Sequence, residues 1–178
     1  MKNQHGFTIW FTGLPSCGKT TIAEQIAVIL NTKGYKVEQL DGDIVRKIVS
    51  KDLGFSKQDR DENIRRAIGL AKTLTHDDTV VLASFVSPYR KQRREARKEI
   101  QKFIEVYVRC PVEICIQRDV KGLYKKALEG KIKDFTGIDD PYEEPEHPEL
   151  IVDTSKESIE QSVKKVLQKI EELGYLIC

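Results

Sequence analysis

A phosphate-binding pattern stands near the start of the sequence, where residues 13–20 (Gly-Leu-Pro-Ser-Cys-Gly-Lys-Thr) match G-x-x-x-x-G-K-[ST]. In this pattern the glycines let successive backbone N–H groups turn inward around a phosphate chain, the lysine reaches the terminal phosphates, and the hydroxyl binds Mg²⁺. A following helix adds the positive end of its dipole. An apolar run before the loop and a helical pattern after it argue against a chance glycine turn. The pattern predicts a purine nucleoside triphosphate with Mg²⁺, held in part by Lys19 and Thr20.

A second candidate is the acidic stretch Asp41-Gly42-Asp43, which follows residues 36–40, a segment that reads as a strand. Open parallel sheets bind their ligands at the carboxyl ends of their strands, so this stretch is expected beside the phosphates. Asp43 could orient an acceptor hydroxyl, accept its proton, or hold Mg²⁺ through water. It could also simply cap the next helix, which Asp favours. We expect Asp41 to have a structural role.

The sequence separates three uses of a phosphate loop. A GTPase would normally carry an Asn-Lys-x-Asp guanine-binding motif, which this chain lacks. A large mechanical ATPase would need more residues and usually a strand ending in an acidic metal-holding residue, whereas the third predicted strand here runs into residues 84–87, Ser-Phe-Val-Ser. A small kinase is left, which aligns an acceptor hydroxyl with the γ-phosphate of ATP and excludes water.

Strands and helices alternate along the chain and must position these residues. The hydrophobic patterns predict strands at 7–11, 36–40, 79–85, 103–108 and 150–152, and helices at 20–32, 44–49, 57–75, 88–102, 111–118, 121–129 and 155–173. Residues 130–148 are rich in Gly, Pro and acidic side chains and are expected to form a loop or lid. We therefore predict an α/β three-layer sandwich, with a doubly wound, mostly parallel five-stranded sheet of the P-loop NTPase type. It forms a single domain over 1–178 with a small lid at about 121–148.

Composition narrows the class of protein further. The net charge of +2 is too small to argue for an obligatory nucleic-acid partner. No apolar run approaches the roughly 18 residues needed to cross a bilayer, and residues 1–6 do not resemble a signal peptide, so we expect a cytoplasmic protein without a membrane partner. The four cysteines lack metal-ligand spacing and are expected to be free thiols. Cys17 could be sensitive to oxidation among the anion-binding donors, or it could be an inert thiol.

Seven stretches, in order along almost the whole chain, give it a resemblance to the adenylylsulfate kinase (APS kinase) family. They are residues 13–20, 40–43, 53–56, 59–66, 84–90, 121–126 and 137–142. The resemblance implies transfer of the γ-phosphoryl group of ATP to the 3′-hydroxyl of adenosine 5′-phosphosulfate (APS), which gives ADP and 3′-phosphoadenosine 5′-phosphosulfate in sulfate assimilation. ATP is then expected to bind at Gly13, Leu14, Pro15, Ser16, Cys17, Gly18, Lys19, Thr20 and Thr21.

The same resemblance implies a site for the sulfated nucleotide. A guanidinium fork matches a tetrahedral oxyanion, which favours arginines of the segment 46–66, although helix arginines can also simply face solvent. In the resembling enzymes two aromatic residues, here Phe55 and Phe135, sandwich the adenine of this substrate. The full set of expected contacts is Asp43, Arg46, Phe55, Arg60, Asn63, Arg65, Val86, Ser87, Lys121, Leu123, Phe135 and Thr136.

Lys19, Asp43 and Ser87 are the expected catalytic residues. Lys19 would stabilise charge on the transferring phosphoryl group, and Asp43 would act on the 3′-hydroxyl, with Mg²⁺ held by Thr20 and by Asp43 through water. In the resembling enzymes the serine at position 87 can carry a phosphoryl group. A covalent intermediate is therefore one interpretation, and a hydrogen bond to the substrate with direct transfer is the one we favour.

The resemblance also suggests partners. Relatives often form dimers, so a homodimer is expected, as is functional coupling to the ATP sulfurylase that makes APS. The segment 90–102 carries seven Lys or Arg against two Glu and is expected to provide solubility and electrostatic steering. Two alternatives stay open at this point: a kinase of another nucleotide or small metabolite, and a nucleotide-dependent binding module without turnover.

Overall fold

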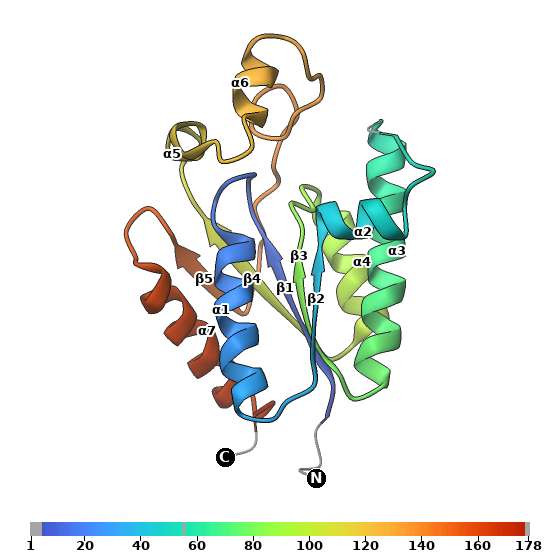
Figure 1. The fold of residues 1–178 in the computed structure, drawn as a ribbon, viewed down its shortest axis with the longest axis vertical. Coiled ribbons are helices and arrows are strands. Elements are labelled where there is room, and N and C mark those ends of the chain that lie inside the picture. Colours follow the sequence, from blue (N-terminus) through green and yellow to red (C-terminus); the bar gives the residue numbers. More distant parts are fainter. Residues whose placement is uncertain (1–4, 55, 177–178) are drawn as a thin grey trace.

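The structure is a computed structural model that describes residues 5–54 and 56–176. Its strands all run parallel in one sheet, in the order β2-β3-β1-β4-β5 (Figure 1). The strands are β1 (Phe7–Thr12), β2 (Val37–Asp41), β3 (Val80–Ser84), β4 (Phe103–Arg109) and β5 (Leu150–Asp153). The helices are α1 (Lys19–Thr32), α2 (Gly42–Ile48), α3 (Lys57–His76), α4 (Arg90–Ile100), α5 (Val112–Arg118), α6 (Leu123–Leu128) and α7 (Ile159–Glu172). Among the helices of the described residues, none combines the length and apolar character needed to cross a membrane.

Strand β1 lies at the centre of the sheet and is buried on both faces. Phe7, Ile9 and Phe11 pack in one core with α1 and α7, whereas Trp10 packs in a second core with α3 and α4. Successive side chains of a strand point to opposite faces, which explains this division. Figure 1 shows α1 and α7 on one side of the sheet and α2, α3 and α4 on the other. The predicted three-layer α/β sandwich with a five-stranded sheet is confirmed, and every strand pairing in it is parallel.

The strand order fixes where a ligand can bind. Strand β1 has β3 on one side and β4 on the other, so the chain first builds one half of the sheet and then the other half. Such a reversal opens a crevice at the carboxyl ends of the strands. The loop that follows β1 lies at this edge, and α6 with the loop that follows it stands above the same edge (Figure 1).

The last helix begins later than the sequence pattern suggested. We predicted a start at Ser155, but α7 begins at Ile159 with Ser158 as its N-cap. The Ser158 hydroxyl accepts from the N–H of Gln161 at 3.2 Å, and the Gln161 side chain accepts from the N–H of Ser158 at 2.8 Å. This reciprocal pair is a capping box, which stabilises a helix start more than a lone serine does. Ser155 instead donates its hydroxyl to Asp153 in the preceding turn.

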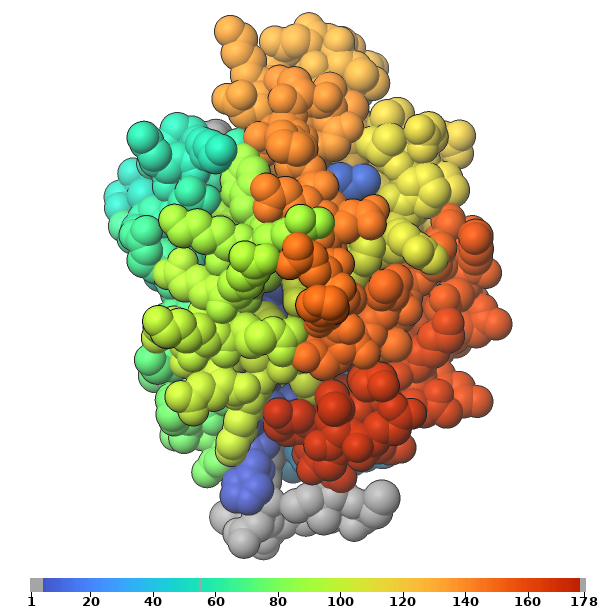
Figure 2. All heavy atoms as spheres, turned by 180° about the vertical axis from the view of Figure 1, so that it is seen from behind, coloured from blue at the N-terminus to red at the C-terminus, as the bar shows by residue number. Residues whose placement is uncertain are grey.

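An acidic strap, residues 143–149, lies along α4. Arg97 makes a bidentate contact with Glu149, at 2.6 and 2.8 Å, and Arg94 pairs with Glu146 at 2.7 Å. Buried Arg93 donates to the carbonyl of Glu143. Figure 2 shows the strap in orange beside α4 in yellow-green. These arginines of α4 therefore hold the strap in place, a role that we did not anticipate for this basic segment.

Glu149→Gln is expected to lower the free energy of unfolding by about 1 to 3 kcal/mol near neutral pH, because Arg97 and the N–H of Glu105 lose a charged acceptor. Burial raises the pKa of Glu149, but hydrogen bonds from Arg97 and the Glu105 N–H outweigh it and leave this pKa below its usual value. A lowered carboxyl pKa stabilises the fold above the unfolded-state pKa, and the contribution is lost as pH falls through the folded-state pKa.

Urea unfolding at about pH 7 and about pH 3 checks this, since the difference between wild type and Glu149→Gln should shrink in acid. Glu146→Gln is the matched control, because its pair with Arg94 is exposed and should contribute at most about 1 kcal/mol. An equal loss at both pH values would contradict the assignment.

Candidate active site

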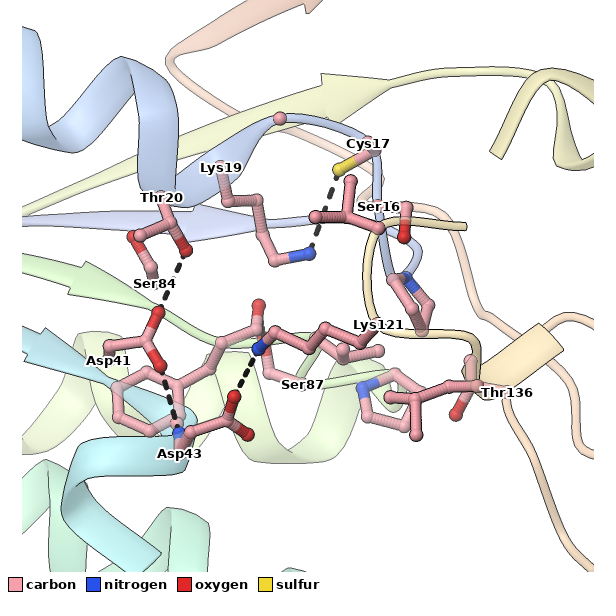
Figure 3. Close-up of a pocket in the computed structure, with 18 of the residues that line it drawn as sticks. Ser16, Cys17, Lys19, Thr20, Asp41, Asp43, Ser84, Ser87, Lys121 and Thr136 are labelled. Carbon is pink, nitrogen blue, oxygen red and sulfur yellow. Dashed lines mark hydrogen bonds and ion pairs between the residues drawn. The ribbon is translucent and has the colours of Figure 1, made fainter. Parts of the chain in front are cut away.

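A cavity of about 840 Å³ opens at the carboxyl ends of the strands. This volume falls in the range of small-molecule sites. Its walls come from the loop after β1, the start of α2, the end of β3, the first turns of α3 and the segment around α6, and Figure 3 draws part of this lining. Segments far apart in the sequence therefore meet around one space.

The loop after β1, residues 13–20, has the backbone geometry of a phosphate loop. Gly13 and Gly18 have φ of 155° and 104°, which L side chains rarely adopt. A Cβ atom on Gly13 would lie 2.4 Å from the carbonyl oxygen of Val108 and 2.8 Å from Sγ of Cys17. No larger residue fits at Gly13, so this position depends on glycine for both its conformation and its close packing.

Lys19 is the first residue of α1 and is only 8% exposed. Its Nζ donates to the carbonyl oxygens of Gly13 at 2.9 Å and Leu14 at 2.8 Å, and lies 3.6 Å from Sγ of Cys17. The ammonium group of Lys19 is thus held by carbonyl oxygens of the phosphate loop itself. Cys17 is fully buried, which favours the inert-thiol interpretation over an exposed oxidation sensor.

The acidic stretch after β2 faces the phosphate loop. Thr20 donates its hydroxyl to Asp41 Oδ2 at 2.8 Å, and Asp41 Oδ1 accepts from the N–H of Asp43 at 2.9 Å. Asp41 is therefore the N-cap of α2, and the carboxylate of Asp43 is not used for capping. It forms an ion pair with Lys121 instead, which joins the sheet side of the cavity to the segment before α6 (Figure 3).

Ser87 lies in the cavity wall, but its hydroxyl is engaged inside the protein. The residue is 1% exposed and has φ of 37°, an unusual value for a residue that precedes proline. Its Oγ accepts from Trp10 Nε1 at 3.0 Å and donates to Thr12 Oγ1 at 3.1 Å, and its carbonyl accepts from Arg93. These contacts hold the end of β3 in a fixed shape at the cavity.

The first turns of α3 bring two polar side chains to the cavity. Arg60 donates through Nη1 to the carbonyl oxygen of Asp134 at 2.8 Å, while its Nε and Nη2 are buried and have no hydrogen-bond partner among the described residues. Asn63 is 5% exposed, and its Oδ1 is likewise buried without a partner. Buried polar groups are normally satisfied, so these atoms fit a polar ligand.

Other expected contacts have different surroundings. Arg65 lies outside the cavity lining and pairs with Glu62 on the exposed side of α3, so we no longer include it in the site. Arg46 lines the cavity and donates to the carbonyl oxygen of Gly54. Phe55 lies outside the described residues. The cavity wall does contain Val86, Lys121, Leu123, Phe135 and Thr136.

The segment around α6 packs on the phosphate loop through aromatic contacts. Phe135 meets the ring of Tyr124 edge-on, with ring centroids 5.0 Å apart. The Tyr124 hydroxyl donates to the carbonyl oxygen of Pro15 at 3.0 Å, and burial raises the pKa of this tyrosine above its usual range. A Cβ atom on Gly137 would come within 3.0 Å of Leu14. Phe135 is therefore placed by contacts that begin in the phosphate loop.

Sequence reasoning missed the far end of the cavity, which Arg118, Thr154 and Ile159 line. Arg118 donates to Thr154 through both Nη atoms, at 3.2 and 2.6 Å, and Thr154 donates to the carbonyl oxygen of Cys17 at 2.7 Å. The only local signal was a charged pair, Arg118-Asp119, at a helix end. We also gave Asp41 a structural role alone, although it contacts the Thr20 hydroxyl directly.

The fold and the site together define a small phosphate-loop kinase: a parallel α/β sheet, a glycine-rich loop leading into α1, and a carboxylate and an arginine facing that loop. The sequence matches the family described as adenylylsulphate kinase over residues 5–153. The adenylyl-sulfate kinase of Halothermothrix orenii is 56% identical over 176 residues, covering 99% of this chain and 95% of that one. The chain belongs to the adenylylsulfate kinase family.

Two further similar proteins are informative about ligands and partners. The Mycobacterium tuberculosis APS kinase CysC, solved in complex with AMPPNP and APS, superposes with a TM-score of 0.89 at 38% identity, covering 94% of this chain and 99% of that one. A probable bifunctional SAT/APS kinase 2 from Sorangium cellulosum is 52% identical over 171 residues, covering 96% of this chain but 29% of that protein.

Proposed function

We propose that this chain transfers the γ-phosphoryl group of ATP to the 3′-hydroxyl of APS, giving ADP and 3′-phosphoadenosine 5′-phosphosulfate. The observation that carries the proposal is one cavity lined by a phosphate loop and by Arg60, whose Nε and Nη2 are buried donors without a partner in the part of the chain that the structure describes. A guanidinium edge of this kind suits a second anionic ligand. The relative solved with AMPPNP and APS supports the same pair of ligands here.

We assign the ATP end of the cavity to residues 13–21. Rotation of the Lys19 side chain away from the carbonyls of Gly13 and Leu14 would bring its ammonium to the terminal phosphates. The adenine would then lie toward Arg118 and Ile159, because a guanidinium plane and an aliphatic side chain offer flat and apolar contact. The phosphates would thus contact the phosphate loop and the base would contact Arg118. Thr154 joins these two parts of the site, because it donates to the carbonyl oxygen of Cys17 and accepts from Arg118.

The oxygen atoms near Thr20 fit Mg²⁺. A hydroxyl and a carboxylate oxygen, Thr20 Oγ1 and Asp41 Oδ2, lie 2.8 Å apart beside the phosphate loop, and Asp43 follows two residues later in the first turn of α2. Magnesium prefers oxygen ligands and typically takes one or two from the protein together with phosphates and water. Thr20 would ligate the ion, with Asp41 and Asp43 near it through water. When bound, the ion would neutralise charge on the phosphate chain.

The APS end is assigned to the α3 side and the segment around α6. Arg60 and Asn63 would bind the phosphosulfate and ribose through their buried polar atoms, and Phe135 would cover the adenine. Phe55, which the resemblance pairs with Phe135, remains part of the proposal. Further contacts would come from Arg46, Val86, Ser87, Lys121, Leu123 and Thr136.

Asp43 is the residue we assign to the acceptor hydroxyl. The carboxylate would accept a hydrogen bond from the 3′-hydroxyl and take its proton as the oxygen bonds to the γ-phosphorus and the bond to the β-phosphate oxygen breaks. Lys121 pairs with Asp43 across the cavity, and both side chains are more than half exposed, so substrate can displace this ion pair at little cost. Lys19 would stabilise the charge that develops on the transferring group.

Ser87→Ala should keep its rate within about tenfold of wild type, because transfer is direct, whereas removal of a true nucleophile costs about a million-fold. The hydroxyl already has partners in Trp10 and Thr12, which supports a structural role. Loss of the acceptor for buried Trp10 Nε1 should lower the free energy of unfolding by about 1 to 3 kcal/mol. Steady-state rates, urea unfolding and the intact mass of wild type after ATP alone check this. A phosphorylated wild-type protein and an inactive variant would contradict it.

ADP release tests the proposal as a whole. APS should stimulate it, whereas AMP and gluconate should not. Stimulation by another acceptor alone would point to a different kinase on this scaffold, and nucleotide binding without any ADP release would indicate a binding module. We further propose a cytoplasmic homodimer that is functionally coupled to an ATP sulfurylase, which the bifunctional SAT/APS kinase relative supports.

A further inference from the structure

The two edges of the Arg60 guanidinium have different neighbours. Nη1 faces the loop 134–140, where it donates to the carbonyl oxygen of Asp134 at 2.8 Å and lies 3.5 Å from Asp140 Oδ2. Nε and Nη2, which form the other edge, are buried without a partner among the described residues. Arg60 as a whole lines the cavity. Two adjacent N–H groups on one edge are the donors that bind an oxyanion in bidentate fashion.

Asp140 is itself fixed from a third element. Both of its carboxylate oxygens lie close to the hydroxyl of Tyr89, at 2.8 and 2.9 Å, and its side chain is 13% exposed. Tyr89 is the N-cap residue of α4. Burial, followed by the hydrogen bond to Asp140, raises the pKa of Tyr89 to about 12, so the hydroxyl keeps its proton throughout the neutral range. Asp140 therefore keeps the Tyr89 hydroxyl as a hydrogen-bond donor throughout the neutral range.

The loop 134–140 is closed by hydrogen bonds between its own residues. The carboxylate of Asp139 accepts from the N–H groups of Asp134, at 2.8 Å, and Phe135, at 2.5 Å. The carbonyl of Asp140 accepts from the N–H of Gly137 at 2.9 Å. The two groups that hold Arg60 thus lie in the same closed loop as Phe135, the aromatic residue assigned to the substrate adenine.

We propose that Asp140, anchored by Tyr89, is a positioning residue that turns the Nε and Nη2 edge of Arg60 toward the phosphosulfate of APS. Because the same loop carries Phe135, this contact links recognition of the anion to recognition of the base. ATP binds at the opposite side of the cavity, so the effect is specific for the second nucleotide. The inference rests on the proposed function.

Asp140→Asn tests this inference, because the amide keeps the shape of the side chain and removes the charge that faces Arg60. The KM for APS should rise about tenfold, while kcat and the KM for ATP stay within about twofold. Tyr89→Phe should raise the KM for APS in the same selective way, which provides a second variant should Asp140→Asn fold poorly. Glu146→Gln, an acidic residue of the exposed strap, is the matched control and should match wild type.

A double-mutant cycle separates positioning from loop stability. In an Arg60→Lys background, which has lost the bidentate edge, Asp140→Asn should add little further loss in kcat/KM for APS. An unchanged KM for APS, an equal rise in both KM values, or independent effects in the cycle would overturn the inference while wild type stays active with APS. Wild type without APS-dependent ADP release would instead overturn the proposed function, and this inference with it.

Discussion

Replacing Lys19 with methionine is expected to lower kcat about 1000-fold, since removing one preorganised charge donor from a transition state costs this order of magnitude. Lys19 is the buried cation of the phosphate loop, held between the carbonyl oxygens of Gly13 and Leu14. Methionine fills a similar volume without the charge. Steady-state ADP formation with saturating ATP and APS measures the loss, and calorimetric binding of ADP shows whether the loop still accepts a nucleotide.

Lys125→Met is the matched control for Lys19→Met. Lys125 lies on α6 and its side chain is exposed, so its loss should change kcat by no more than about twofold. Thermal unfolding of both variants separates a folding defect from a catalytic one. A folded Lys19→Met protein with a rate within about tenfold of wild type would remove Lys19 from the transition state.

Asp43→Asn is expected to lower kcat by about 100- to 10,000-fold, the range for loss of a general base, while ATP binding survives. The carboxylate of Asp43 is not the cap of α2, because Asp41 accepts from its N–H. The substitution therefore removes the charge that we propose acts on the acceptor hydroxyl, without removing a helix cap. The ion pair with Lys121 is exposed on both sides, so its loss should cost little stability.

Asp52→Asn provides the comparison for Asp43→Asn. Asp52 is exposed and forms an ion pair with Arg66 away from the cavity. The hydrogen bond from Arg66 lowers the pKa of the Asp52 carboxyl. Asp52 does not line the cavity, so its substitution should not affect the substrates. Single-turnover rates with preformed ATP complex should separate the two variants clearly. A full single-turnover rate in Asp43→Asn would exclude Asp43 from proton transfer.

The elements around the phosphate loop could be predicted because local patterns determine them. The run Phe7 to Phe11 is β-branched and aromatic, and the loop motif fixes the start of α1 within one residue of the predicted position. The capping box of α7 was also readable, since Ser158 stands three residues before Gln161. We gave more weight to Ser155, although a lone serine binds a turn as readily as it caps a helix.

Helical periodicity could have separated the arginines of α3. Arg60, Asn63 and Ile64 are three and four residues apart, so they share one face, and all three line the cavity. Arg65 is five residues from Arg60, which turns it well away from that face, and it pairs with Glu62. The family resemblance supported both arginines, but the geometry of the helix favours Arg60.

Long-range contacts explain what the sequence could not reveal. Asp140 lies 80 residues from Arg60 and 51 from Tyr89, so no local pattern connects the three. The arginines of α4 could be recognised as a basic face, but their pairing with the strap depends on how residues 143–149 pass along α4. Arg118 was missed for the same reason, because its partner Thr154 follows β5.

In the proposed reaction two purine nucleotides occupy one cavity together, one held by the phosphate loop and the other by Arg60 and Phe135. Titration of APS into protein saturated with ADP measures this directly by calorimetry. We predict one APS site on each chain of the ADP-loaded protein, with binding that Arg60→Ala weakens and that AMP does not reproduce. Absence of a second nucleotide site on ADP-loaded protein would contradict the account.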